Sequence, residues 1–101
     1  MPMRRTIERR LRTTSRRLQQ ARDDLAVTDE QLAQLSDEAA DAEIRGIVAD
    51  DPSAGLDSVE AARHRDAMAR HRQDLIATIA RLEGAQDELL DALTADRSPG
   101  R

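Results

Sequence analysis

Two long heptad patterns separated by one short break constrain this chain more than any other feature of its sequence. From Ile7 to Gly46, apolar or small residues recur at alternating spacings of four and three, as in a helix that packs along one seam. A second pattern, one of seven-residue intervals, begins after the break and runs through Ala61, Met68, Leu75, Leu82 and Leu89. The sequence therefore predicts two helices, at residues 4–46 and 58–95.

The break between the patterns predicts a turn at residues 47–57. Gly46 allows a left-handed helix cap, Pro52 is excluded from a helix interior, and Gly55 frees the backbone again. Asp57 and Glu60 have the spacing of a capping box, which places the start of the second helix at residue 57 or 58; Asp51 before Pro52 could start a preliminary turn. We expect residues 96–101 to form a disordered tail.

The two patterns dock best as an antiparallel pair in which facing residue numbers sum to 103. In this register a large residue of one helix meets a small or polar residue of the other in almost every layer, for example Leu18 with Ala85. The flanking charges agree with this register through three pairs of opposite sign: Arg17 with Glu88, Asp24 with Arg81, and Asp29 with Arg72. The predicted fold class is all-α: a two-helix antiparallel coiled-coil hairpin that could pair into a four-helix bundle.

Composition argues against an enzyme. The chain of 101 residues has no Phe, Trp, Tyr or Cys, so it lacks the aromatic volume that a deep substrate pocket normally uses, and it has no thiol nucleophile. Adjacent acids such as Asp23 and Asp24 point about 100° apart on a helix and do not form a catalytic pair. No cofactor is expected, and without an apolar stretch long enough to span a bilayer we expect a cytoplasmic protein with no membrane role.

Four aliphatic residues of the second helix lie off its predicted seam, at b and e positions: Ile76, Ile79, Leu90 and Leu93. Single exposed aliphatics are ordinary, but four on one flank of a two-helix hairpin indicate a second interface. They favour self-association, or docking on a protein partner, over a lone monomer.

The charged residues divide the chain into a basic beginning and an acidic middle. Residues 1–22 carry a net charge of +7, residues 23–60 of −11, and residues 61–101 of zero. On the predicted outer face of the first helix lie four arginines that could contact an anion: Arg5, Arg9, Arg12 and Arg16. The net charge of −4 and the lack of aromatic residues disfavour nucleic acid, and a solvated helix face is the simpler interpretation.

His64 and His71 fall at seam positions of the second helix. Seven residues apart on one face, they are about 10 Å from each other, too far to chelate one ion, and no third ligand is spaced to help. We therefore expect both to be seam residues, with no metal bound.

The predicted turn also carries a group of acids at its tip: Asp50, Asp51 and Asp57. A solvated, capped turn explains them. A hairpin with an acidic tip also resembles the coiled-coil hairpins of Gre-type transcript cleavage factors and DksA-type regulators, which insert acidic tip residues into bacterial RNA polymerase. The resemblance rests on the hairpin and on Asp50 and Asp51, and the globular docking domain of those factors has no counterpart here. The length and topology are also similar to those of small helical-hairpin secretion substrates, but their Trp-x-Gly turn is absent.

The sequence leads to two functional hypotheses. The first is a non-enzymatic coiled-coil interaction or adaptor protein, acting on a protein partner or on itself as a homo-oligomer. The alternative is a bacterial transcription regulator that probes RNA polymerase with its acidic tip.

Overall fold

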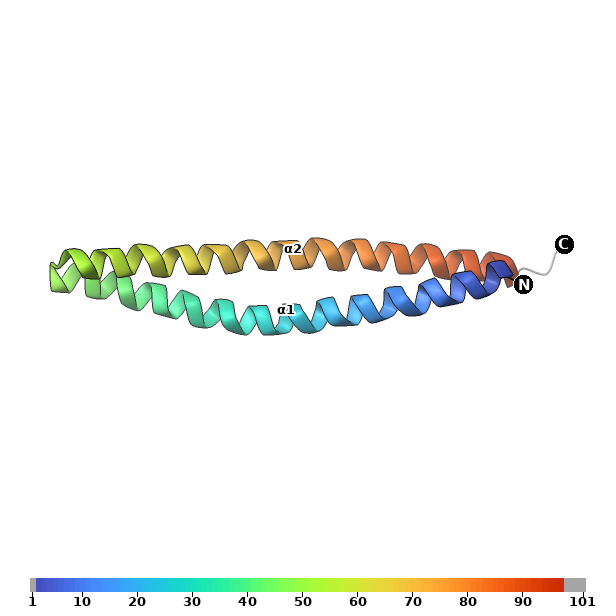
Figure 1. Ribbon diagram of the computed structural model, residues 1–101, viewed down its shortest axis with the longest axis horizontal. Coiled ribbons are helices and arrows are strands. Elements are labelled where there is room, and N and C mark those ends of the chain that lie inside the picture. The colour runs from blue at the N-terminus through green and yellow to red at the C-terminus, as the bar shows by residue number, and fades with distance from the viewer. Residues whose placement is uncertain (1, 98–101) are drawn as a thin grey trace. The chain divides into compact units, whose positions relative to one another are not determined.

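The computed structural model describes residues 2–97, which form two α-helices joined through Asp50 and Asp51 (Figure 1). Helix α1 spans Pro2–Ala49 and helix α2 spans Pro52–Arg97. These residues contain no strand. The predicted all-α helical hairpin is confirmed.

The hairpin divides into two compact units. The terminal unit contains residues 2–24 of α1 and 75–97 of α2, and the turn unit contains residues 25–74. Within each unit the α1 and α2 segments lie side by side and run in opposite directions (Figure 1). Each unit therefore has its own stretch of the interface between the helices.

The turn is shorter than the predicted 47–57, because both helices continue into that range. Asp51 caps α2: its Oδ1 accepts a hydrogen bond from the Ser53 backbone N–H (3.1 Å) and its Oδ2 accepts one from the Ser53 hydroxyl (2.9 Å). Its carbonyl oxygen accepts hydrogen bonds from the next N–H groups along the helix, those of Ala54 and Gly55. Pro52 thus occupies the first helical position, where a missing N–H and a fixed φ cost nothing.

The two glycines expected to break the helices lie inside them instead. Gly55 is in the first turns of α2, and Gly46 is in the last turns of α1, close to α2. A Cβ at Gly46 would lie 3.4 Å from the carbonyl oxygen of Ala54, at the edge of van der Waals contact. Glycine at this position lets the two backbones approach each other next to the turn.

The buried residues of α1 follow its predicted seam. Leu18 is the largest fully buried side chain among the described residues, with 2% of its surface exposed. The other buried residues of the helix all belong to the same 4-3 pattern: Ile7, Ala21, Thr28, Ala39 and Ala42. No described buried side chain has an unsatisfied polar atom, so Thr28 is accommodated in the seam without a lost hydrogen bond.

Helix α2 packs with a face that is rotated from the predicted one. The column from Ala61 to Leu89 is half-buried as expected, but His64, His71 and Ala92 of the second column are exposed. The residues one position later in each heptad are half-buried instead: Arg65, Arg72, Ile79, Gln86 and Leu93.

The prediction that His64 and His71 are seam residues is therefore wrong. Turning Ile79 and Leu93 inward removes more apolar surface from water than burying an imidazole or an alanine would, and it leaves the imidazoles hydrated. The rotation is partial, since Thr78 and Ala85 of the predicted column stay half-buried.

Polar contacts between the helices gather along one edge of α1, formed by Ser15, Arg22 and Asp29 at seven-residue spacing. In the terminal unit the Gln86 amide donates to the Ser15 hydroxyl (3.0 Å), and Arg22 pairs with Glu83 (3.0 Å). In the turn unit Arg72 pairs with Asp29, as predicted. Such partly exposed pairs contribute only about 0.2–1 kcal/mol each, so they fix register more than they stabilise.

The other two predicted pairs do not form. Within residues 2–97 no ion pair joins Arg17 to Glu88 or Asp24 to Arg81. These residues belong to the opposite edge of the hairpin, which the polar contacts leave open.

Candidate functional site

Exposed aliphatic side chains surround the turn, and we refer to them together as the turn patch: Ile44, Ile47, Val48, Leu56 and Val59. They account for five of the nine large hydrophobic residues that are exposed within the described chain, and 49–78% of each is accessible to solvent. A hairpin leaves some aliphatics exposed by chance, but five within sixteen positions form a concentrated apolar surface.

The turn patch is hollowed on one side. A groove of about 450 Å³ is lined on the α1 side by Ile44, Arg45, Val48 and Ala49, and on the α2 side by Ser53, Ala54 and Asp57. Because both helices contribute to its walls, the groove exists only when the turn is folded.

Sequence reasoning did not single out the turn patch. Its residues fall outside the seam, and the acids between them directed attention to charge. The signal that could have found it is the spacing of Ile44, Ile47 and Val48, which are three and four residues apart and so share one face of a helix, although none of them continues the 4-3 pattern.

The three predicted tip acids occupy different environments. Asp51 is engaged in capping α2 through both carboxylate oxygens. Asp50 has a φ of 49°, in the left-handed region, and is exposed. Asp57 is exposed on the first turns of α2 and lines the groove of the turn patch. Only Asp50 and Asp57 therefore present carboxylates that are not used by the fold.

The predicted aliphatic strip on α2 does not form a single exposed surface. Ile76 (37% exposed) and Leu90 (45% exposed) face solvent, whereas Ile79 and Leu93 are half-buried on the face that packs against α1. The rotation of α2 thus divides the four residues between the hairpin interface and its outside.

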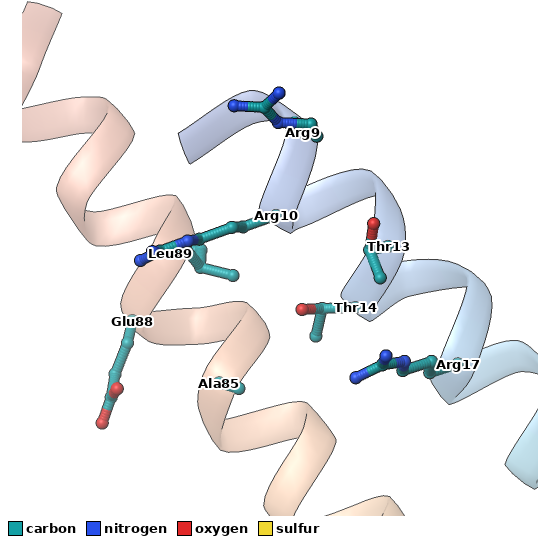
Figure 2. A pocket seen from close by; sticks show the side chains of 8 residues that line it. All are labelled: Arg9, Arg10, Thr13, Thr14, Arg17, Ala85, Glu88 and Leu89. Carbon is teal, nitrogen blue, oxygen red and sulfur yellow. The ribbon is translucent and has the colours of Figure 1, made fainter. Parts of the chain in front are cut away.

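A second groove lies in the terminal unit, and we refer to it as the Arg groove (Figure 2). It has a volume of about 570 Å³ and is lined by residues of both helices: Arg9, Arg10, Thr13, Thr14, Arg17, Ala85, Glu88 and Leu89. Figure 2 shows Arg10 and Arg17 reaching from α1 toward α2, while the Glu88 carboxylate points away from Arg17. The groove therefore combines a small-residue and leucine floor with a basic rim.

Of the four arginines predicted as an anion contact, only Arg9 lines this groove. Arg5, Arg12 and Arg16 are exposed elsewhere on α1, and Arg16 donates a long hydrogen bond (3.5 Å) to the Thr13 hydroxyl. Arg10, together with Arg17 of the predicted pair with Glu88, joins Arg9 instead. The basic surface that has a defined shape is thus the edge of the hairpin rather than its outer face.

The exposed histidines line a smaller hollow in the turn unit. Leu35, Ala67 and Met68 form its apolar part, beside His64 and His71, and its volume is about 330 Å³. Among residues 2–97, no group of three or more His, Cys, Asp or Glu side chains could hold a metal ion. Over the same residues, neither helix has a stretch apolar enough to cross a bilayer.

No family model, curated protein or solved structure matches this chain. The two larger hollowed surfaces of the hairpin, at the turn patch and the Arg groove, are therefore the candidate binding sites.

Proposed function

We propose that this chain is a non-enzymatic interaction protein that binds another protein chain through its turn patch. The observation that carries the proposal is the concentration of exposed aliphatic side chains around the turn, from Ile44 to Val59. Fully burying one such side chain is worth about 1.5–3 kcal/mol, so covering several of them supplies a substantial driving force for association. The protein would act in the cytoplasm, without a cofactor and without a membrane role.

Two further features support a protein as the partner. The groove beside Val48 is apolar and formed by both helices, as a site for an aliphatic anchor would be. Its charged lining residues are Asp57 and Arg45, and Asp50 is exposed at the turn beside it, so the surroundings are acidic on balance and favour a partner with a basic border around an apolar centre.

The test places a photoreactive amino acid at Val48 in the cell and identifies the crosslinked proteins by mass spectrometry. The matched control carries the same amino acid at Val27, which is also exposed and also on α1 in the turn unit but is not part of the turn patch. We expect discrete crosslinked species from Val48 and not from Val27. Equal or absent crosslinking at the two positions would rule out the turn patch as the binding surface.

A second candidate function is the transcription regulator that resembles Gre-type and DksA-type hairpins. What favours it is Asp50, whose carboxylate is exposed at the turn with no hydrogen bond or ion pair to the described residues. The discriminating pair of variants is Asp50→Asn and Ile47→Gln, each assayed for binding to RNA polymerase and for binding to the partner that is crosslinked at Val48. A polymerase probe should lose binding with Asp50→Asn, whereas a patch-driven adaptor should lose its partner with Ile47→Gln.

A further inference from the structure

We propose that the turn patch binds the Arg groove of a second copy of this chain, and that the contact is reciprocal, so that two hairpins associate about a two-fold axis. This inference rests on the proposed function, because it names the partner of the same surface. It is carried by the shapes and charges of the two surfaces, which lie in different units of the hairpin.

The charges of the two surfaces are complementary. The Arg groove belongs to the basic beginning of the chain, where residues 1–22 have a net charge of +7. The turn patch belongs to the acidic middle, where residues 23–60 have a net charge of −11. With the facing α2 residues included, residues 1–24 and 75–101 carry a net charge of +3 and residues 25–74 of −7, so placing one unit against the opposite unit of a second copy brings opposite net charges together.

The guanidinium groups of the Arg groove form no ion pair within residues 2–97, although the Glu88 carboxylate also lines the groove. Arg9, Arg10 and Arg17 form no ion pair there, while Arg22, on the opposite edge of α1, is paired with Glu83. The hairpin thus satisfies the cations of one edge and leaves those of the other available. On the acidic side, Glu43, Asp57 and Glu60 are exposed and make no ion pair within the same residues.

The apolar parts also match. The lining of the Arg groove includes Leu89, Ala85 and the two threonines, and its apolar part suits aliphatic side chains such as Ile47 or Val48. Because every copy carries both surfaces, one two-fold operation makes two identical contacts and closes the assembly. Nucleic acid also has the charge to fit the Arg groove, but the chain offers no aromatic side chain for base stacking and is acidic overall.

A charge exchange tests the reciprocal contact. The groove variant carries Arg9→Glu, Arg10→Glu and Arg17→Glu, and the turn variant carries Glu43→Arg, Asp57→Arg and Glu60→Arg. The turn variant leaves Asp51 in place, so the cap of α2 is kept. Sedimentation equilibrium measures the mass of each protein alone and of an equimolar mixture, against a chain mass of 11.2 kDa.

We expect the wild-type protein to form a dimer and each variant alone to dissociate, with a dissociation constant raised at least about tenfold. The equimolar mixture should form a 1:1 heterodimer, because each mutated surface then meets an opposite charge. A control with Arg5→Glu, Arg12→Glu and Arg16→Glu has the same change in net charge outside the groove and should stay dimeric. Circular dichroism at 222 nm checks that all four proteins are helical.

Three outcomes would overturn the inference: a monomeric wild-type protein, a dimer that survives both variants, or a mixture that stays monomeric. If the wild-type protein is a monomer whose groove variant loses affinity for a single-stranded oligonucleotide, the Arg groove binds nucleic acid instead. Failure here is distinct from failure of the proposed function: crosslinking at Val48 to a different protein would keep the turn patch as a binding surface, whereas no crosslinking at Val48 would remove both.

Discussion

The two adjacent acids at the turn show how neighbouring residues of one type take different parts in this fold. Asp51 accepts hydrogen bonds that start α2, so its carboxylate is a structural group. Asp50 has a left-handed backbone, a conformation that costs most residues roughly 1–2 kcal/mol but that Asn, Asp and Gly tolerate better. Alanine at either position would therefore lower the stability as well as remove the charge, and asparagine is the substitution that isolates the charge.

The cap predicts a difference between two substitutions at Asp51. Asp51→Ala should lower the free energy of unfolding by about 0.5–2 kcal/mol, because the Ser53 N–H loses its acceptor. Asp51→Asn should lower it much less, since the amide oxygen still caps the helix. Urea denaturation followed by circular dichroism measures both, and equal losses from the two variants would contradict the capping role.

Glycines within the helices predict a gain in stability. Gly84 lies in the interior of α2, and a Cβ there would meet no atom within 4 Å. Gly84→Ala should therefore raise the free energy of unfolding by roughly 0.5–1 kcal/mol, through helix propensity and a less flexible unfolded chain.

Gly46→Ala is the matched comparison, because its Cβ would lie 3.4 Å from the carbonyl oxygen of Ala54. We expect a smaller gain or none at this position. A larger gain at Gly46 than at Gly84, in the same denaturation experiment, would show that the helices do not approach closely beside the turn.

At the scale of the helices, the sequence predicted the face by which α1 packs against α2 but not the face by which α2 packs against α1. The seam of α1 contains large side chains such as Leu18 and Leu25 with few aliphatics beside it, so its period defines a single face. In α2 the aliphatics are spread around the helix, and two phases compete: one buries His64 and His71, the other Ile79 and Leu93. Which of the two faces packs against α1 depends on the side chains of α1, and the spacing of apolar residues in α2 alone does not determine it.

The rotated face of α2 predicts unequal effects at two leucines three residues apart. Leu93→Gln should lower the free energy of unfolding by about 1–2 kcal/mol, because Leu93 is half-buried against α1, and Leu90→Gln by under about 0.5 kcal/mol. Thermal melts of both variants at low protein concentration provide the measurement. If Leu90→Gln proved the more damaging, α2 would present the other face to α1.

At the scale of the whole molecule, the sequence predicted how charge is distributed along the chain but not which parts of the surface form grooves. The basic beginning and the acidic middle follow directly from the residue order. The turn patch and the Arg groove depend on how the helices end and rotate: α1 continues to Ala49, which adds Ile47 and Val48 to a helix surface, and the polar contacts occupy only the edge of Ser15. Neither the end of a helix nor its rotation against its neighbour is encoded in a local sequence pattern.

Reciprocal association predicts that the stability of the protein depends on its concentration. Since the dimer binds a second folded chain and not an unfolded one, mass action should raise the melting temperature as the total concentration rises. Salt should oppose this, because screening shortens the Debye length from about 10 Å at 0.1 M to about 3 Å at 1 M and weakens the attraction between the acidic and basic regions.

The groove variant with Arg9, Arg10 and Arg17 replaced by Glu should melt at one temperature at every concentration. Calorimetry across a hundredfold range of protein concentration, over which such linkage changes stability by roughly 2.7 kcal/mol, makes the measurement. A wild-type melting temperature that does not move with concentration would contradict the association of two copies through the turn patch.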